Sequence, residues 1–507
     1  MNAQEYRPVA RGGPRTRKDA MPMSRRWWTL VAVSLATFMT YLDNNVTNVA
    51  IPTIERSLHL PVAGLEWVVS SYLLVFAGLL LAGGRLADYY GRRRMFLIGL
   101  AIFTPASLAA GLAGSGAVLI ASRAVQGLGA ALLVPATLAI ILATFDDARE
   151  RTTALGVWNA AGAMALASGP LIGGFISQHL RWGWIFVLNV PVGVVTFVIA
   201  AAAVRESRGA RDGATACRLD LLGLAASAVT LFSLTYALIE GHDRRWTSPL
   251  IAGAFALAMA SLAVFVVIES RASHPMVALS MFRSRVFSGG TVTMMLWAFG
   301  VFGIYFFTAI YLQNILGFSP TKAGLAFVPM ALAVALFSGL AGPVAARAGT
   351  HRTVAGGMLL MAAGLFLITL LGRGATFAGL MPGFLMFGAR AGLMNVPLAN
   401  AVLQATPPER SGIASALLNA SREVAGLLGI TVIGAVLRSR EGAALHDGAG
   451  AVPAFIDGFH AGLYVTVGLA VAGVLVSYLA LRRFASVPGG AEPEQGAITR
   501  DKVAAPL

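Results

Sequence analysis

Long apolar runs, separated by short polar segments, recur along almost the whole chain. Each run is long enough to cross about 30 Å of hydrocarbon as a helix that rises 1.5 Å per residue. The pattern predicts an all-α polytopic membrane protein with fourteen transmembrane helices. The runs lie at 27–52, 65–85, 95–113, 117–143, 154–176, 184–203, 220–239, 250–268, 287–312, 323–345, 353–371, 377–403, 411–437 and 459–481.

Composition and charge support this class. Of 507 residues, 57% are hydrophobic and 12% are charged, whereas a soluble domain carries about 25% charged residues. Most of the 38 Lys and Arg residues lie in loops on the side of the amino terminus, so the positive-inside rule predicts that both termini are cytoplasmic. The net charge of +15 therefore reflects topology. Nucleic-acid binding is excluded because no soluble domain would carry it.

The ends of the chain and its single cysteine give two further expectations. The basic segment 1–26 leads directly into the first run, which indicates an uncleaved first span. Cys217 is the one cysteine, so no internal disulfide can form. The excess of Arg, Ala and Gly is typical of a GC-rich bacterial genome, so we expect a bacterial protein.

A weak internal repeat divides the chain. GRLADYYGRRR follows the second run and GPVAARAGTHR follows the tenth, and both stretches place two glycines seven residues apart before a closing Arg. Many carriers consist of two such halves with the substrate site between them near the midplane. We therefore expect five segments: a cytoplasmic basic tail, 1–26; a six-helix half, 27–203; a linker with two extra helices, 204–283; a second six-helix half, 284–483; and a cytoplasmic tail, 484–507.

Six stretches, in the expected order, match motifs of one family. They are LDNNVTNVAIP, at Asp43 and Asn48; GRLADYYGRRR, at Gly84, Asp88, Gly91, Arg92 and Arg93; LIASRAVQGLGAA, at Arg123 and Gln126; ASGPLIGG, at Gly169, Pro170, Gly173 and Gly174; WIFVLNVPVG; and YLQNILGFSPTKAG. The chain resembles the major facilitator superfamily and, more narrowly, its fourteen-span drug/proton antiporters. The resemblance implies a major facilitator fold in the bacterial cytoplasmic membrane, with a small molecule and protons as ligands, and we expect a monomer.

The first span contains an acidic residue, Asp43, where lipid would exclude one. Ionisable residues inside spans are costly and usually face a cavity with a partner, and Arg123 of the fourth span is the candidate partner. Burial favours the protonated acid and a nearby arginine favours the carboxylate, so such a pair can load and release a proton. The resemblance implies proton coupling at this pair. The alternative is a static buried ion pair.

Two motifs are predicted to act in the conformational change of the protein. The glycines Gly84 and Gly91 allow a tight loop, and Asp88 can pair with Arg92 or Arg93, so this loop is predicted to be a latch that holds the inward-closed state. A solvated basic loop is the alternative. In the fifth span, Pro170 bends the helix and its neighbouring glycines leave a surface of small residues for close packing. The resemblance implies that this motif favours export.

Candidate residues for a substrate cavity come from three spans. The ninth run is rich in aromatic residues, and drug exporters hold flat molecules through stacking and cation–π contacts. Trp297 and Tyr305 are the better candidates because each has a polar group, although rings that face lipid are the alternative. Asn48 and Gln126 are the candidates from the first and fourth spans.

Two charges depart from the family pattern. Arg390 lies in the twelfth span and Glu423 in the thirteenth, and each would cost roughly 3 kcal/mol near the bilayer centre if left alone. Adjacent helical residues point about 100° apart, so Arg422 is poorly placed to pair with Glu423. We therefore hypothesise an Arg390–Glu423 pair between the two helices. The alternative is that the spans are shifted, so that these charges reach an interface or water.

The function predicted from these features is proton-coupled export of drugs or other amphipathic small molecules. A primary pump would need a phosphate-binding glycine-rich loop, which the chain lacks. The sequence contains no cluster of His, Cys and carboxylates for enzymatic or metal chemistry, so neither an enzyme nor a cofactor or metal site is expected. The alternatives are an importer or an endogenous-metabolite exporter of the same fold, or a non-transporting membrane receptor.

Overall fold

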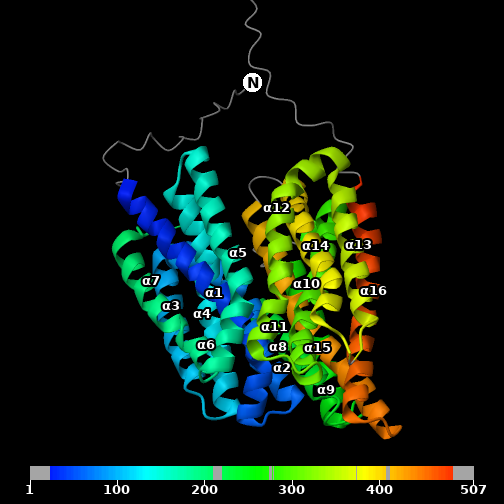
Figure 1. Ribbon diagram of the computed structural model, residues 1–507. Coiled ribbons are helices and arrows are strands. Elements are labelled where there is room, and N and C mark those ends of the chain that lie inside the picture. The colour runs from blue at the N-terminus through cyan, green and yellow to red at the C-terminus, as the bar shows by residue number, and fades with distance from the viewer. Residues whose placement is uncertain are drawn as a thin grey trace, which may run out of the picture.

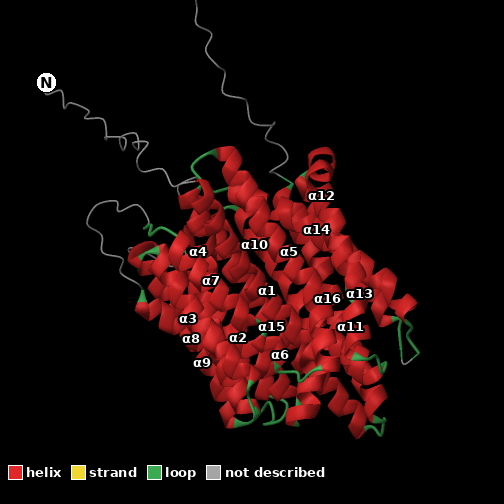
Figure 2. Ribbon diagram, turned by 60° about the vertical axis from the view of Figure 1, so that its left-hand side comes forward, coloured by secondary structure: helices red, strands yellow, loops and turns green. Residues whose placement is uncertain are grey.

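The computed structural model describes residues 23–208, 220–272, 277, 279–372, 374–406 and 411–482. Every element assigned within these ranges is a helix, and the loops lie mainly at the two ends of the helices (Figure 2). Thirteen helical spans are long and apolar enough to cross a membrane. The remaining long helix, α1, has 36 residues and is less apolar because of Asp43 and its neighbouring asparagines. The all-α polytopic prediction is therefore confirmed.

Three sets of helices follow one another along the chain. The first set is α1 (Met23–Leu58), α2 (Val62–Tyr90), α3 (Arg92–Gly111), α4 (Gly116–Thr144), α5 (Ala148–His179), α6 (Trp184–Val187) and α7 (Asn189–Ala203). The next two are α8 (Leu221–Glu240) and α9 (Pro249–Arg271). The last set is the 3-10 helix η2 (Leu279–Arg283), α10 (Arg285–Ile310), the π-helical turn η3 (Tyr311–Ile315), α11 (Pro320–Ala326), α12 (Val328–Ala348), α13 (Thr350–Thr369), α14 (Phe377–Gln404), α15 (Ser411–His446) and α16 (Ala451–Leu481).

Two predicted spans are broken into consecutive helices. The run at 184–203 forms α6 and α7, which meet at Leu188, and the run at 323–345 lies within α11 and α12, which meet at Phe327. Each break lies just before a proline, Pro191 or Pro329. Proline has no N–H to donate and its ring clashes with the preceding turn, so the first turn of a new helix accommodates it most easily. Other prolines, such as Pro135 and Pro170, nevertheless lie inside continuous helices.

The helices form two groups (Figure 1). Helices α1–α7 make up one group and α10–α16 the other, and the groups contact each other through α2 with α15, α5 with α11, and α1 with α10. The pair α8 and α9 packs together, and α8 contacts both α2 and α15. The beginning of α1 and the end of α16 lie at the same end of the bundle, at the top of Figure 1. We call this end the terminal face, and the opposite end, where α1 ends and α2 begins, the far face.

Small residues allow close contact between neighbouring helices inside each group. A methyl group added at Gly83 of α2 would lie 2.0 Å from the carbonyl oxygen of Ala131 on α4, so the two backbones touch. Such contacts replace the hydrophobic driving force that is absent between helices in lipid. Large apolar side chains are exposed on the outside, as on α9, which is the least buried span. This surface is suited to hydrocarbon.

Candidate functional site

Asp43 lies inside the first helix group, and its side chain is fully buried. Nη1 of Arg123 donates a hydrogen bond to Oδ2 of Asp43, and the two side chains form a buried ion pair. Helix α1 packs directly on α4, which brings together two residues that are distant in the sequence. The predicted partners are therefore adjacent, and their role in proton coupling stays a prediction.

Two amides and a hydroxyl complete the surroundings of the Asp43 carboxylate. Its Oδ1 accepts hydrogen bonds from Nδ2 of Asn189 at 2.8 Å and from Nε2 of Gln126 at 3.2 Å. Both amides also lie within bonding distance of Oγ of Ser107, at 2.9 and 2.8 Å. Oε1 of Gln126 accepts from Arg123 at 3.0 Å. The carboxylate is thus held by three donors in a connected network, which low polarity strengthens.

Sequence reasoning did not identify Ser107 or Asn189. Asn189 stands in the WIFVLNVPVG stretch, where an amide within an apolar run was an available signal. Ser107 lies in α3 with no comparable signal, because serine is common in membrane helices. Gln126 was predicted to line the substrate cavity, and its described hydrogen bonds instead join Asp43, Arg123 and Ser107.

Aromatic rings cover the Arg123 guanidinium. Its Cζ lies 4.4 Å from the ring centroid of Tyr72 and 5.5 Å from that of Phe186. Its Nε donates to the carbonyl of Val68 at 3.3 Å. Nη2 is buried and has no hydrogen-bond partner among the described residues. The network we call the Asp43 site (Asp43, Ser107, Arg123, Gln126 and Asn189) is therefore buried and has its charges paired.

The predicted pair between Arg390 and Glu423 is wrong in this structure. Glu423 pairs with its neighbour Arg422, whose Nη2 lies 2.6 Å and Nε 3.0 Å from Oε1 of Glu423. The expectation considered only the directions of the two Cβ atoms, whereas the long arginine side chain can turn back to the adjacent residue. The Arg422 side chain also lies near Tyr41 of α1, so this ion pair of the second group faces the first group.

Arg390 of α14 is fully buried without an acidic partner among the described residues. Its Nε donates to the carbonyl of Phe387 at 3.3 Å, and its Nη1 lies 2.9 Å from the sulfur of Met361. Its Nη2 finds no hydrogen-bond partner in the described ranges. The guanidinium carbon lies 4.4 Å from the Phe387 ring centroid and 5.6 Å from that of Trp297.

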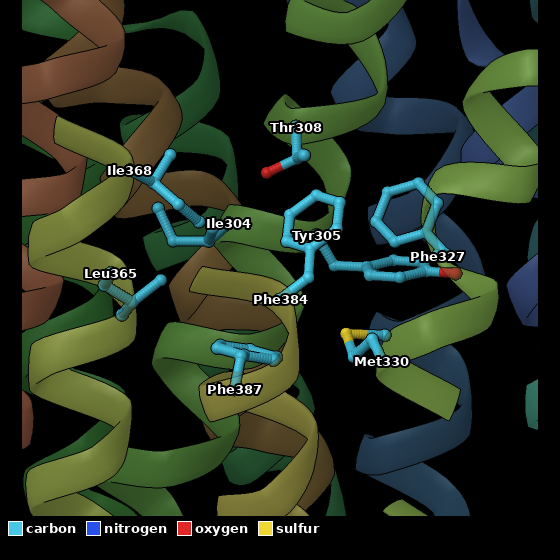
Figure 3. A pocket seen from close by; sticks show the side chains of 9 residues that line it. All are labelled: Ile304, Tyr305, Thr308, Phe327, Met330, Leu365, Ile368, Phe384 and Phe387. Atoms are coloured by element: carbon cyan, nitrogen blue, oxygen red, sulfur yellow. The ribbon is translucent and has the colours of Figure 1, made fainter. Parts of the chain in front are cut away.

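A narrow apolar pocket adjoins Arg390 through the shared Phe387. Figure 3 shows Tyr305 of α10 beside Phe327 and Met330, with its hydroxyl directed away from Ile368. The centroids of the Tyr305 and Phe327 rings are 4.6 Å apart. The pocket is lined by Ile304, Tyr305, Thr308, Phe327, Met330, Leu365, Ile368, Phe384 and Phe387.

The four predicted cavity residues therefore do not meet at one place. Trp297 and Tyr305 are buried inside the second group rather than exposed to lipid. Asn48 is half-buried on α1, and its Oδ1 has no hydrogen-bond partner in the described part of the chain. Gln126 belongs to the Asp43 site. The residues stay candidates for substrate contact.

The GRLADYYGRRR loop is held by contacts within the first group. Asp88 accepts two hydrogen bonds from Arg92, at 2.9 Å from Nε and 2.8 Å from Nη2. Arg92 also donates to the carbonyl of Ala139 in α4 at 3.3 Å. These bonds fix the loop onto the terminal face of α4. The predicted role of this loop as a latch that holds the inward-closed state stays a prediction.

The structure explains why position 91 of the same loop is a glycine. Its φ is +116°, and an added methyl group would lie 2.5 Å from the carboxylate of Glu206. That carboxylate accepts from the backbone N–H groups of Arg93 and Arg94, each at 3.1 Å. An anion is favourable at the amino terminus of a helix. Gly91 thus lets Glu206 bind the first turn of α3.

The fifth-span motif packs α5 on both neighbours. Toward α1, a methyl group at Gly169 would lie 2.5 Å from Cβ of Asn45, and one at Gly173 would lie 2.8 Å from the carbonyl oxygen of Val46. These distances leave no room for a side chain. The small residues predicted to allow close packing therefore face α1.

The same motif also forms a contact with the second group. A methyl group at Gly174 would lie 2.4 Å from the carbonyl oxygen of Pro320, and one at Gly324 would lie 2.2 Å from that of Pro170. Each helix thus presents a glycine to a proline carbonyl of the other. We call this reciprocal contact between α5 and α11 the glycine seam.

Further polar contacts join the two groups at the far face. Arg438 of α15 pairs with Glu66 of α2 in a buried ion pair and donates to the carbonyl of Ile239 at 2.9 Å. Gln313 donates to the carbonyl of Val49 at 2.8 Å. Sequence reasoning missed the Glu66–Arg438 pair, although a glutamate inside the second span was a signal. The far face is therefore closed by ion pairing, hydrogen bonds and the glycine seam.

Among the described residues, no three or more His, Cys, Asp or Glu side chains lie together so that they could hold a metal ion.

Comparison with known proteins agrees with this architecture. The family model "Major Facilitator Superfamily" matches residues 33–430. The multidrug resistance protein Stp of Mycobacterium tuberculosis (strain CDC 1551 / Oshkosh) is 36% identical over 411 residues, covering 81% of this chain and 75% of that protein. The puromycin resistance protein pur8 of Streptomyces alboniger is 34% identical over 459 residues, covering 90% of each chain.

Solved structures show the same fold at low identity. The POT family transporter PepTSo superposes with a TM-score of 0.69 at 15% identity, covering 92% of this chain and 99% of that one. A bacterial homolog of the human lysosomal transporter Spinster, in an inward-facing and unoccupied conformation, gives a TM-score of 0.66 at 18% identity, covering 92% and 98%. The motifs, the two helix groups and the family match together establish that the chain belongs to the major facilitator superfamily.

Proposed function

We propose that the protein exports amphipathic small molecules across the bacterial cytoplasmic membrane in exchange for protons, and that Asp43 carries the coupling proton. The observation that supports this most directly is the buried Asp43 site. A static ion pair in a membrane interior adds little net stability, whereas an acid beside an arginine and two amides can exist in either protonation state.

Protonation of Asp43 would change the contacts of Arg123. Loss of the negative charge removes the attraction that holds the guanidinium, whose Nη2 already has no hydrogen-bond partner among the residues that the structure describes. Tyr72 stacks on that guanidinium, and its helix, α2, packs on α15 of the second group. Helix α1, which carries Asp43, contacts α10 of the second group. These contacts provide a physical connection between proton binding and the relative position of the two groups.

The described contacts support an assignment of sides. We propose that the terminal face is cytoplasmic, as the distribution of Lys and Arg predicts, and that the far face is the external side. The far-face contacts and the glycine seam would then close the external side while the substrate site opens to the cytoplasm. We further propose that 27–203 and 284–483 are the moving halves and that 204–283 is an insertion. The tails, 1–26 and 484–507, lie almost entirely outside the described residues.

The relatives support the class of substrate. Their names include a multidrug resistance protein, a puromycin resistance protein, and a tetracenomycin C resistance and export protein of Streptomyces glaucescens. We propose that this chain likewise exports drug-like molecules and acts as a monomer, with no enzymatic step.

The test is proton-driven transport in proteoliposomes. Ethidium, puromycin and 1-naphthoate serve as probes, because they span positive and negative charge. We expect the wild-type protein to move at least one probe uphill when a proton gradient is imposed, and Asp43→Asn to abolish that movement. Exchange of labelled probe across the membrane without a gradient should persist in Asp43→Asn, because substrate binding and conformational change remain.

Glu150→Gln is the matched control, because Glu150 is a half-exposed acid at the terminal face that pairs with Arg26. It should transport as the wild type does. Uphill export by Asp43→Asn at the wild-type rate would refute the role of Asp43. If no probe moves uphill in the wild type, the proposed export activity on these probes fails.

A further inference from the structure

Arg390 is a buried cation of the second group and has no acid beside it in the described part of the chain. The other deeply placed arginines among the described residues have one: Arg123 pairs with Asp43, Arg438 with Glu66, and Arg422 with Glu423. Arg390 instead contacts a backbone carbonyl, a thioether sulfur and two aromatic rings.

A purely structural role does not explain such a residue. An uncompensated charge at the centre of a membrane helix costs about 3 kcal/mol or more, and apolar residues of similar volume replace buried charges without loss of stability. A thioether is a weak hydrogen-bond acceptor, so the contact with Met361 offsets little of this cost. The positive charge of Arg390 is therefore not compensated, and a bound anion would stabilise it.

Two more hydrogen-bond donors in the second group also lack a partner among the described residues. Nε1 of Trp297 and the hydroxyl of Tyr305 are buried without a hydrogen-bond partner in the described part of the chain, as is Nη2 of Arg390. Trp297 lies within cation–π distance of Arg390, and Tyr305 shares the apolar pocket with Phe387, on which Arg390 stacks. Buried polar groups are normally hydrogen-bonded, so the neighbouring unpaired donors of Arg390 and Trp297 indicate a missing acceptor, whereas the Tyr305 hydroxyl lies about two turns further along α10.

The helix directions place these groups in order. Helices α10 and α13 run away from the terminal face, whereas α14 runs toward it. On each of the three, the residue near the guanidinium lies closer to the terminal face than the pocket residue: Trp297 precedes Tyr305, Met361 precedes Leu365, and Arg390 follows Phe387. The charged end therefore lies on the terminal side of the apolar pocket.

We infer that Arg390 binds an acidic group of the exported molecule, and that the aromatic side chains behind it move apart to hold the molecule's apolar part, because the pocket that they line in this structure has a volume of only about 10 Å³. The ligand class is an amphipathic organic anion or zwitterion with a planar ring system. Its carboxylate or similar group accepts from Arg390 and from Trp297, and its ring stacks among Tyr305, Phe327, Phe384 and Phe387. Met361 is displaced from the guanidinium, which its flexible side chain allows. This inference rests on the proposed export function.

The test compares two probes that share a naphthalene ring and differ in charge, 1-naphthoate and 1-naphthylmethylammonium. Binding to the purified full-length protein in nanodiscs is measured by titration, and unfolding temperature is measured with and without each probe. We expect Arg390→Met to weaken 1-naphthoate binding about tenfold or more, the factor for loss of a charge-assisted hydrogen bond. Binding of the amine should change about twofold or less, and Arg390→Lys should be intermediate for the acid.

The unfolding temperature without ligand separates binding from structure. A binding role predicts that Arg390→Met unfolds at the wild-type temperature or above it, because an unpaired charge is removed. Arg352→Met, at an exposed arginine of α13, controls for the loss of one positive charge and should leave both affinities unchanged.

Three results would overturn the inference: equal weakening of both probes, a lower unfolding temperature of ligand-free Arg390→Met, or no preference of the wild type for the acid. These results are independent of the proton-coupling test, because binding is measured without a gradient. A failure of the export proposal is therefore recognised separately, in the transport assay of the wild-type protein.

Discussion

Arg123 and Arg390 lie on corresponding helices of the two groups and differ in their surroundings. Each is fully buried on the helix that makes the fourth crossing of its group, α4 or α14. Arg123 has a carboxylate, two aromatic rings and an amide around it. Arg390 also has two rings, but a methionine sulfur occupies the place of an acid. The same cation is thus compensated from within the protein in one half and left uncompensated in the other.

The difference suggests a division of labour between the halves. The ion pair of Asp43 and Arg123 has no net charge, and binding of a proton to Asp43 would remove the attraction between the two side chains. A cation without an acid responds to an anion that arrives from outside. In our proposals, the first half therefore carries the coupling ion and the second half recognises the exported molecule.

The largest loss of stability is expected when the first half is made to resemble the second by removal of its acid. Asp43→Leu leaves Arg123 buried without its acid and should destabilise the protein by about 3–5 kcal/mol. Adding Arg123→Met should recover most of that loss, while uphill transport stays absent in both variants. Thermal unfolding and membrane abundance measure the effect. A single variant as stable as wild type would contradict our account of the compensated pair.

The reverse change gives the second half an acid. Met361→Glu places a carboxylate where the methionine sulfur now lies 2.9 Å from Arg390, so a buried ion pair should form. The protein should still fold, and its affinity for 1-naphthoate should fall about tenfold or more because the anion site is already filled. Met361→Gln, of similar size without charge, is the control and should retain more affinity. Equal affinities of the two variants, measured by the same titration, would count against an anion site.

A smaller change refines the description of the compensated side. Ser107→Ala removes the hydroxyl shared by Gln126 and Asn189 but keeps the ion pair. We expect a loss of about 1 kcal/mol in stability, with transport reduced at most a few-fold. Ser227→Ala is a suitable control, because that hydroxyl bonds only to its own helix among the described contacts. Complete loss of uphill transport in Ser107→Ala would mean that the hydroxyl participates directly in proton movement.

The spans and the Asp43–Arg123 contact were predictable because each follows from a large free-energy term. Apolar length determines which segments cross the membrane, and a charge in the first span requires a partner in another. The breaks before Pro191 and Pro329 were not predictable from proline alone, because Pro135 and Pro170 lie inside continuous helices.

Other contacts depend on information that a single sequence does not contain. Ser107 and Asn189 join the Asp43 site only because their helices are rotated toward α1, and hydropathy does not give that rotation. Glu66 and Arg438 meet through the packing of α2 on α15. The pairing of Arg422 with Glu423 depends on an arginine rotamer, which the angle between adjacent Cβ atoms does not determine.

The glycine seam has a kinetic consequence. Its two contacts join backbone to backbone at distances that exclude even a methyl group, and dispersion attraction falls steeply once such a gap widens by about 1 Å. A half-open seam would therefore lose most of the attraction of a closed one without gaining a passage for solute. Intermediate widths should be short-lived, so the seam behaves as an all-or-none barrier. Any leak through it would then be set by how often it opens, rather than by how wide it stands.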